Sequence, residues 1–309
     1  MSKKKVLILG SNGFLGRHTL SCLSNNEQFD IVEIRDSSEL DIRNYEELNS
    51  YLKKNRPDHI INCAAFVGGI SYGYKYQAKL LEHNVKLGIN IYQASLENKI
   101  LSVINPISNC VYPENISLYK EEDLWNGPPH ESVYFYAQSK RFLIALAQGY
   151  KKEHGLNSVN VIMSNMYGPF DHFDPDRSHA LGALLKKIYD AKVQKENKVE
   201  IYGTGKPLRE WLYVEDAAIS LVKSLDLESD YYLFNVGVNE GISVLDLAKK
   251  IAKKVNWEGE FTFDLSRPDG VRAKTVDGTY GKKILGWEPQ VDLDTGIAKT
   301  VEWYMEENG

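Results

Sequence analysis

Short apolar runs alternate with segments of helical periodicity along the first half of the chain. Residues 5–10 form a continuous apolar run that ends in glycine, as expected for a strand buried on both faces of a parallel sheet. Apolar residues at helical spacing follow over 14–23, and a second strand is expected at 31–34. The same alternation then predicts helices over 46–55, 77–98 and 134–152, and strands at 59–64, 101–104 and 159–163.

This order of strands and helices predicts an α/β fold with a Rossmann-type, doubly wound parallel sheet. The pattern breaks after Tyr167-Gly168-Pro169, where residues 170–178 are rich in Asp, Pro and His and have no regular period. Residues 214–225 and 232–236 are expected to rejoin the sheet domain. We therefore predict one domain from residues 1–168 and about 211–240, and a smaller mixed α/β C-terminal lobe from about 169–210 and 241–309.

Composition and charge exclude several classes of partner. The chain has 309 residues and a formal net charge of -5, which gives no reason to expect nucleic acid or an anionic membrane surface. No apolar run approaches the roughly 20 residues that span a bilayer, so we expect a cytoplasmic protein. Cys22, Cys63 and Cys110 are odd in number and widely spaced, which predicts free thiols and no metal site.

A glycine-rich loop directly follows the first predicted strand. It comprises Gly10, Ser11, Asn12, Gly13, Phe14, Leu15 and Gly16. Glycines at this spacing allow a sharp turn and leave backbone amides at the start of the helix for phosphate oxygens. Because the loop lies within a βαβ unit, we predict a dinucleotide-binding domain rather than a merely structural turn. Arg35 and Asp36 after the second strand leave NADPH and NADH both open, since basic and acidic residues there favour opposite cofactors.

Tyr136 and Lys140 are four residues apart on a predicted helix, so their side chains share one face. A lysine ammonium near a tyrosine favours the phenolate, and we expect Lys140 to lower the pKa of Tyr136. Ser108 is predicted just after a strand, at the sheet edge where ligands of doubly wound folds bind. Together with the glycine loop, these three residues predict catalysis by hydride transfer to a carbonyl group.

These motifs resemble the extended short-chain dehydrogenase/reductase family. The resemblance spans nearly the whole chain and also includes Asn62-Cys63-Ala64-Ala65 and Asn165-Met166-Tyr167-Gly168-Pro169. Within that family the segments 67–70, 108–113, 178–179 and 207–210 are similar to those of the GDP-L-fucose synthases. That subgroup epimerises carbons 3 and 5 of GDP-4-keto-6-deoxymannose and reduces carbon 4 with NADPH. The resemblance therefore implies a GDP-sugar substrate, NADPH in preference to NADH, and a homodimer.

The resemblance also implies roles for individual residues. Cys110 would be the base and His179 the acid of the epimerisation, because a ketone acidifies the hydrogens on the neighbouring carbons. Cys110 lies two residues beyond Ser108, and in an extended chain it would point to the same side. Asn84 is expected to support the site. Further cofactor contacts would come from Ala64, Ala65, Lys140, Met163, Asn165, Met166 and His179, and substrate contacts from Asn109, Asn165, Lys187, Tyr202, Arg209 and Asp269.

Three positions depart from the pattern of that subgroup. Asn12 replaces its usual arginine, Phe66 its lysine and Met163 its proline. Such changes suit a C4 reductase that accepts a GDP-4-keto-heptose already epimerised by another enzyme. A sugar-nucleotide 4-epimerase or 4,6-dehydratase is a further reading, although a dehydratase should carry acidic residues where this chain has Asn109 and Cys110. From another class, a non-catalytic dinucleotide-sensing protein would use the same fold.

Overall fold

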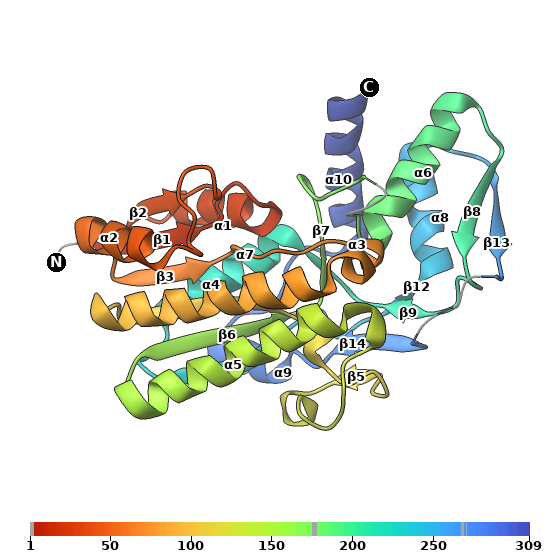
Figure 1. Ribbon diagram of the computed structural model, residues 1–309. Coiled ribbons are helices and arrows are strands. Elements are labelled where there is room, and N and C mark those ends of the chain that lie inside the picture. Colours follow the sequence, from red (N-terminus) through yellow and green to blue (C-terminus); the bar gives the residue numbers. More distant parts are fainter. Residues whose placement is uncertain (1–2, 175–177, 267–268, 270) are drawn as a thin grey trace.

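A six-stranded parallel sheet forms the centre of the molecule, in the computed structural model that describes residues 3–174, 178–266, 269 and 271–309 (Figure 1). The strand order is β11-β6-β4-β3-β1-β2. The chain runs outward from β1 in one direction to β2 and in the other through β3, so the switch point of the sheet lies between β1 and β3. The predicted doubly wound fold is confirmed. The strands are β1 (Lys4–Leu9), β2 (Phe29–Ile34), β3 (His59–Asn62), β4 (Ser102–Ser108), β6 (Asn157–Met163) and β11 (Tyr231–Val236).

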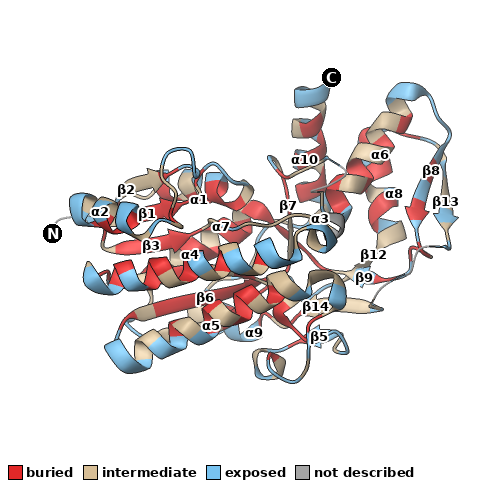
Figure 2. Cartoon of the chain, in the orientation of Figure 1, coloured by how far each residue is buried: buried red, intermediate tan, exposed pale blue. Residues whose placement is uncertain are grey.

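Helices cover both faces of this sheet because successive side chains of each strand point to opposite faces. On β1, Leu7 and Leu9 belong to one apolar cluster, and Val6 and Ile8 belong to another. The first cluster is closed by helices α2 (Tyr45–Asn55), α4 (Gln77–Glu97) and α5 (Tyr134–His154), and the second by α1 (Phe14–Ser24) and α7 (Val214–Lys223). Figure 2 shows the central strands buried between these layers.

The structure differs from the predicted elements at two points that affect the site. Strand β4 continues to Ser108, four residues beyond the predicted end, because its pairing with β6 extends that far. Ser108 is therefore the last residue of a strand. The segment predicted over 214–225 is the helix α7, which covers the sheet, and only β11 joins the sheet as a strand.

The second lobe has its own apolar core between three helices and a pair of strands. These elements are α6 (Ala180–Gln194), α8 (Val244–Val255), α10 (Leu293–Asn308), β8 (Lys198–Tyr202) and β13 (Glu260–Asp264). Figure 1 shows α6, α8, β8 and β13 together at one end of the sheet. A small mixed sheet, in the order β12-β9-β14-β5, lies between the lobes. Its strand β5 comes from within residues 1–168, so the predicted lobe boundaries remain a prediction.

Short elements complete the described chain. The strands are β5 (Leu118–Tyr119), β7 (Asn165–Tyr167), β9 (Leu208–Arg209), β10 (Trp211–Tyr213), β12 (Ile242–Ser243) and β14 (Ala273–Val276), and the helices are α3 (Ile70–Lys75) and α9 (Thr279–Leu285). Single 3₁₀ turns lie at Asn109–Val111, Glu121–Asp123, Glu131–Val133 and Ser224–Asp226. Within the described ranges, no helix has the length and apolar character needed to cross a membrane.

Candidate active site

The glycine loop turns sharply at the carboxyl end of β1, next to the switch point of the sheet. Gly10 has φ +76°, a conformation that other residues rarely adopt, and its amide donates to the carbonyl of Ile34. A Cβ at Gly10 would come within 2.9 Å of the Cα of Ala64, which follows β3. At Gly16 a Cβ would overlap the carbonyl group of Gly10. Both glycines therefore let α1 and the segment after β3 approach the loop closely.

The start of α1 is open to solvent. Its N-cap residue, Gly13, makes no side-chain hydrogen bond to the first turn, and both Asn12 and Gly13 are exposed. Ser11 is buried, and its hydroxyl donates to the Glu33 carboxylate at 2.5 Å. The Arg17 guanidinium donates to the Asn12 carbonyl at 2.8 Å and to its side-chain oxygen at 2.5 Å. Uncapped amides at a helix start are typical of phosphate-binding loops.

A cation and an anion lie directly after β2, at the position where the sequence leaves both NADPH and NADH open as cofactors. The Arg35 guanidinium is exposed and forms an ion pair with Glu39 at 3.2 Å. The Asp36 carboxylate accepts hydrogen bonds from Ser38 and, at 3.4 Å, from the side chain of Asn12. These bonds lower the pKa of Asp36, those from Ser38 most strongly. Arg35 is thus the cation available to a 2′-phosphate, and Asp36 is the acceptor available to a ribose hydroxyl.

Tyr136 and Lys140 lie on the first turns of α5, as predicted. The Lys140 ammonium is 5.8 Å from the centre of the Tyr136 ring and donates to the Pro106 carbonyl of β4 at 3.3 Å. Lys140 is only 5% exposed, and burial lowers its pKa to about 8. It remains mostly protonated at neutral pH and keeps a positive charge beside the phenol.

The expected lowering of the Tyr136 pKa is wrong for the chain without a cofactor. Burial raises this pKa, and the nearby Cys110 raises it further. The removal of the phenol from water outweighs the attraction of the ammonium group, because the cost of ionising a buried group is large. Tyr136 therefore carries its proton at neutral pH.

Cys110 does not continue the extended chain of β4, so the expected reason for its orientation is wrong. It lies in the 3₁₀ turn of residues 109–111, and its amide donates to the Ser108 hydroxyl at 3.4 Å. The thiol nevertheless interacts electrostatically with both Tyr136 and Lys140. Burial raises the pKa of Cys110, while Ser108 and nearby cations oppose that rise. The turn thus brings serine, cysteine, tyrosine and lysine into one cluster.

His179 lies at the N-cap of α6, and its side chain is about half exposed. Its Nδ1 atom is 3.8 Å from Oδ1 of Asp171, a carboxylate that is almost completely buried. Burial alone would lower the pKa of His179, but the interaction with Asp171 outweighs it and raises the pKa. Sequence reasoning missed Asp171, and its proximity to Gly168-Pro169 was the only local signal. The raised pKa suits a proton donor near neutral pH.

Four of the predicted substrate contacts lie along the edge of the second lobe. The Lys187 ammonium is 4.0 Å from the centre of the Tyr202 ring. Thr204, two residues further on, donates to the Asp269 carboxylate through its amide at 2.6 Å and through its hydroxyl at 2.7 Å. Arg209 interacts with the charge of Asp269, and its guanidinium donates to the carbonyls of Leu208 and Val271.

Lys274 is a site residue that sequence reasoning missed. It pairs with Arg209 across the strands β14 and β9, and it interacts with the Cys110 thiol. Tyr119 on β5 likewise interacts with both Arg209 and Cys110. Lys274 and Tyr119 therefore connect the substrate contacts of the second lobe to the catalytic cluster. No sequence motif marks these two residues, because their position depends on the pairing of β5 and β9 with β14.

The remaining predicted residues line the same region or support it. Met163 ends β6 next to Ser108, and Asn165 donates to the Glu210 carbonyl at 2.9 Å. Asn84 accepts from the Phe66 amide and donates to the Phe66 carbonyl, which fixes the loop after β3. Asn109 is buried, and its amide nitrogen has no hydrogen-bond partner among the described residues. Of the others, Ala65 is exposed, whereas Ala64 and Met166 are half-buried.

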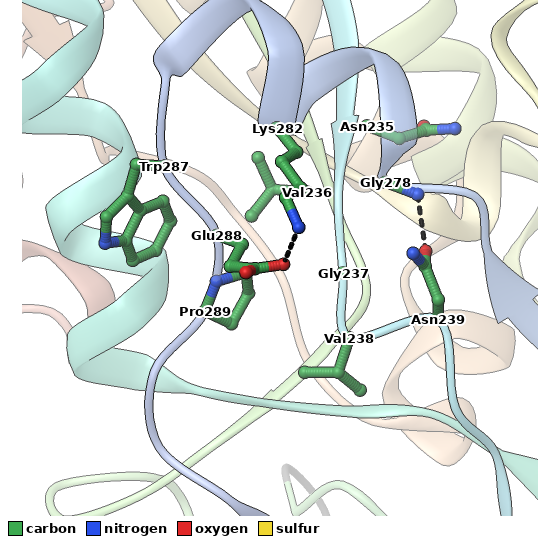
Figure 3. A pocket seen from close by; sticks show the side chains of 10 residues that line it. All are labelled: Asn235, Val236, Gly237, Val238, Asn239, Gly278, Lys282, Trp287, Glu288 and Pro289. Atoms are coloured by element: carbon green, nitrogen blue, oxygen red, sulfur yellow. Dashed lines mark hydrogen bonds and ion pairs between the residues drawn. The ribbon is translucent and has the colours of Figure 1, made fainter.

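Glu210 lies in the predicted segment 207–210, but sequence reasoning gave it no role. It is completely buried between Arg209 and β10, and its two carboxylate oxygens accept from the amides of Val238 and Val276 at 2.6 Å each. A cavity of about 100 Å³ is lined in part by the 235–239 segment (Figure 3). An ion pair between Lys282 and Glu288 lies beside it. As far as the chain is described, its lining includes none of the predicted site residues.

Cys22 and Cys63 are free, half-buried thiols, as is Cys110. Burial raises the pKa of Cys22 to about 11 and that of Cys63 to about 12. Within the described ranges, no group of three or more His, Cys, Asp or Glu side chains is arranged to hold a metal ion.

Comparison with known proteins places this geometry in a family. The model of the NAD dependent epimerase/dehydratase family matches residues 6–237. A GDP-L-fucose synthase of Azorhizobium caulinodans is 34% identical over 307 residues, which cover 99% of this chain and 97% of that protein. A GDP-L-fucose synthetase of Naegleria fowleri, solved with NADP bound, has a TM-score of 0.88 and 27% identity, with 100% of this chain and 96% of that chain covered. A GDP-6-OMe-4-keto-L-xylo-heptose reductase of C. jejuni has a TM-score of 0.89 and 24% identity, with coverage of 100% and 99%.

Proposed function

This chain belongs to the NAD dependent epimerase/dehydratase family, and from that membership we propose that it reduces the C4 ketone of a GDP-4-keto-deoxy sugar with NADPH. The observation that carries the proposal is the cluster of Tyr136, Lys140, Ser108 and Cys110 at the carboxyl end of β4, in which Lys140 is buried and the other three residues are half-buried. A sequence relative from Azorhizobium caulinodans and a structural neighbour from Naegleria fowleri are a GDP-L-fucose synthase and a GDP-L-fucose synthetase by name. NADP is bound in the second of them.

The residues of the chain fit a dinucleotide. The open first turn of α1 offers amides to the pyrophosphate, and Gly10 and Gly16 permit the close packing that keeps those amides in place. Arg35 offers a cation for the 2′-phosphate of NADPH, while Asp36 also allows NADH. Lys140, Met163, Asn165 and Met166 would bind the nicotinamide half, since Met163 ends β6, Asn165 and Met166 follow it on β7, and Lys140 lies on α5.

Tyr136 is the proton donor in the proposed reduction. NADPH, when bound, supplies the hydride that reduces carbon 4. Tyr136 donates its proton to the ketone oxygen, and its raised pKa keeps that proton available at neutral pH. The Lys140 ammonium then stabilises the phenolate that forms, and the Ser108 hydroxyl orients the same oxygen.

Cys110 and His179 are the proposed base and acid of a coupled 3,5-epimerisation. The Cys110 thiolate would take the proton from the carbon next to the ketone, which gives an enolate, and His179 would return a proton to the other face of the sugar. The Asp171 carboxylate raises the pKa of His179, which favours the protonated imidazole that a proton donor needs. This step needs the ketone at carbon 4, which acidifies the hydrogens on the neighbouring carbons, so it precedes the reduction that removes the ketone.

Arg209 and Lys274 are the proposed contacts to the diphosphate of the nucleotide sugar. Both are partly buried cations, and burial lowers the pKa of each; the charge of Arg209, paired with Lys274 across β9 and β14, lowers the pKa of Lys274 further. An anion between them would relieve that repulsion. Lys187, Tyr202 and Asp269 would contact the nucleoside, and Asn109 and Asn165 the sugar.

A second candidate function is C4 reduction alone, on a GDP-4-keto-heptose that another enzyme has already epimerised. Phe66 favours it, because this residue has a ring where the synthases carry a lysine. Its ring lies within 6.3 Å of the ring centres of Tyr72, Tyr76 and His83, which makes the loop after β3 an aromatic surface. Such a surface suits an altered sugar rather than a charged group.

Two copies of the chain are proposed to form a homodimer through α4 and α5. These helices pack side by side, and their outer faces carry partly exposed apolar residues, among them Leu81, Val85 and Ile89 on α4 and Phe142 and Leu146 on α5. A cytoplasmic location and the absence of nucleic-acid and membrane partners stay predictions from the sequence. Sedimentation equilibrium measures the oligomeric state, and a monomer at micromolar concentration would contradict the dimer.

The test is incubation with NADPH and GDP-4-keto-6-deoxymannose in heavy water, with the product analysed by NMR. We expect NADPH oxidation together with deuterium at carbons 3 and 5. Reduction without deuterium at those carbons would contradict the epimerisation and support C4 reduction alone. We would then expect a GDP-4-keto-heptose to be turned over faster than GDP-4-keto-6-deoxymannose. Stoichiometric NADPH binding without turnover of either sugar would contradict the enzyme and support a dinucleotide-sensing protein.

A further inference from the structure

Arg141 is a buried arginine directly after Lys140 on α5. It is only 7% exposed. Its Nε atom donates to the carbonyl of Val111 at 2.7 Å. Its Nη2 atom donates to the carbonyls of Leu124 at 2.6 Å and of Gly127 at 2.8 Å. One guanidinium group thus binds both ends of the segment 111–127.

No carboxylate forms an ion pair with Arg141 within the described part of the chain. Three backbone carbonyls solvate its charge, which is unusual for a buried cation. The guanidinium plane presents several donors in a fixed geometry, so it can reach acceptors in divergent directions. A lysine at the same position has the charge but not this geometry.

The bond to Val111 has a direct consequence for the site, because Val111 follows Cys110 in the same 3₁₀ turn. We propose that Arg141 is a positioning residue, which fixes the backbone of Cys110 to the helix that carries Tyr136 and Lys140. This inference rests on the proposed role of Cys110 in epimerisation. The Arg141 side chain would align Cys110, the proposed base of the epimerisation, with Tyr136 and Lys140, which act in the reduction.

The segment held by Arg141 also reaches the substrate contacts. It contains β5, whose Tyr119 interacts with Cys110 and Arg209, and β5 pairs with β14, two residues after Lys274. Arg141 therefore restrains the position of Tyr119 as well as that of Cys110. The exposed ring of Trp125 covers the guanidinium from outside, 5.6 Å away.

The charge of Arg141 acts on the same thiol. Lys274 on β14 and Lys140 and Arg141 on α5 all favour the thiolate of Cys110. The neutral phenols of Tyr136 on α5 and Tyr119 on β5 face it as well, and Glu114 acts on Lys274. Burial opposes the three cations and prevails, so the loss of one cation should raise the pKa of Cys110 further.

Two substitutions separate position from charge. Arg141→Met removes the charge and all three hydrogen bonds, whereas Arg141→Lys keeps the charge and loses the fork of donors. Arg56→Lys is the matched control, since Arg56 is exposed at the end of α2. Thermal unfolding and NADPH binding establish that each variant is folded.

The first measurement is the pH dependence of iodoacetamide alkylation at Cys110, followed by peptide mass spectrometry. We expect the midpoint to rise by about one pH unit in Arg141→Met and to change little in Arg141→Lys. Alkylation of Cys22 in the same samples is the internal control and should not change. An unchanged Cys110 profile in folded Arg141→Met, together with an unchanged ratio in the second measurement, overturns the inference.

The second measurement is the ratio of deuterium exchange at carbons 3 and 5 to NADPH oxidation. We expect this ratio to fall at least about ten-fold in Arg141→Met. A rise of about one unit in the pKa of Cys110 lowers its thiolate content about ten-fold, and the loss of the hydrogen bonds also misaligns the base. It should fall in Arg141→Lys as well, through position alone, and stay unchanged in Arg56→Lys. A wild-type ratio in Arg141→Lys would show that the fork of hydrogen bonds is dispensable.

The two measurements distinguish failure of the inference from failure of the proposed function. If the wild-type chain exchanges no deuterium, epimerisation is contradicted, and the alkylation profile still tests Arg141. If exchange occurs but neither the profile nor the ratio depends on Arg141, only the inference is overturned. If Arg141→Met does not fold, the ratio of deuterium exchange to NADPH oxidation in Arg141→Lys tests the inference. A lowered ratio supports the inference, and a wild-type ratio overturns it.

Discussion

Glu210 makes the stability of the chain depend on pH in a direction opposite to that of most carboxylates. It is completely buried, and burial raises its pKa to about 7, against the hydrogen bonds from the amides of Val276 and Val238 that lower it. The perturbation is Glu210→Gln, which has the same shape and does not titrate. The difference between wild type and variant therefore isolates the ionisation of this one group.

The sign follows from proton binding. Between pH 4.5, the ordinary pKa, and about 7, the folded chain holds more protons at Glu210 than the unfolded chain does. Stability from this group is therefore complete below pH 4.5 and is lost as the pH rises through 7. The difference in pKa corresponds to about 3 kcal/mol in total, of which about 2 kcal/mol is lost between pH 5 and pH 8.

Differential scanning calorimetry at pH 5, 6, 7 and 8 and constant ionic strength measures this loss. For a chain of this length the unfolding entropy is about 0.6 kcal/mol per kelvin, so about 2 kcal/mol corresponds to about 3 °C. We expect the Tm of wild type, relative to that of Glu210→Gln, to fall by this amount from pH 5 to pH 8. Glu302→Gln, at an exposed carboxyl on α10, is the control and should give a constant difference.

Two results would refute the reasoning. A constant difference in Tm would mean that Glu210 has the same pKa in the folded and unfolded chain. A wild type that gains stability relative to the variant as pH rises would mean that the two amides outweigh burial and keep the carboxylate ionised.

Three further predictions concern the site. Tyr136→Phe should lower the rate of ketone reduction at least about 100-fold, because the proton donor is lost, and should leave NADPH affinity intact. NADPH oxidation measures the rate and fluorescence titration the affinity. A fully active variant would contradict the assignment of Tyr136 as the proton donor. Gly10→Ala should destabilise the chain by about 1–2 kcal/mol and weaken NADPH binding, because residue 10 has φ +76° and a Cβ there would contact the Ala64 backbone. Urea denaturation measures the stability, and a wild-type midpoint would argue against the tight turn. Cys22 and Cys63 should resist alkylation at pH 8, because burial raises their pKa values to about 11 and about 12. Rapid labelling of Cys22 would show that α1 exposes it to solvent, and rapid labelling of Cys63 would show the same for the end of β3.

Much of the fold and part of the site could be predicted because their signals are local. A parallel strand buried on both faces is a continuous apolar run, and a helix at the sheet surface repeats every three to four residues, so the order of elements is visible in the pattern. The glycine loop depends on the conformation of a few consecutive residues, and Tyr136 and Lys140 share a face because of helix geometry alone. Strand ends were less accurate, since the length of β4 is fixed by its pairing with β6.

By itself, the sequence determined a doubly wound sheet with a phosphate-binding turn and a tyrosine and lysine on one helix face. Only the tertiary structure decided that Cys110 approaches them through a 3₁₀ turn, that Arg141 holds this turn, and that Lys274 and Glu210 lie at the small sheet between the lobes. These residues are far apart in the chain, and their contacts depend on strand pairing and packing between segments. The same holds for the pKa of Tyr136, because burial, which no spacing encodes, outweighs the lysine beside it.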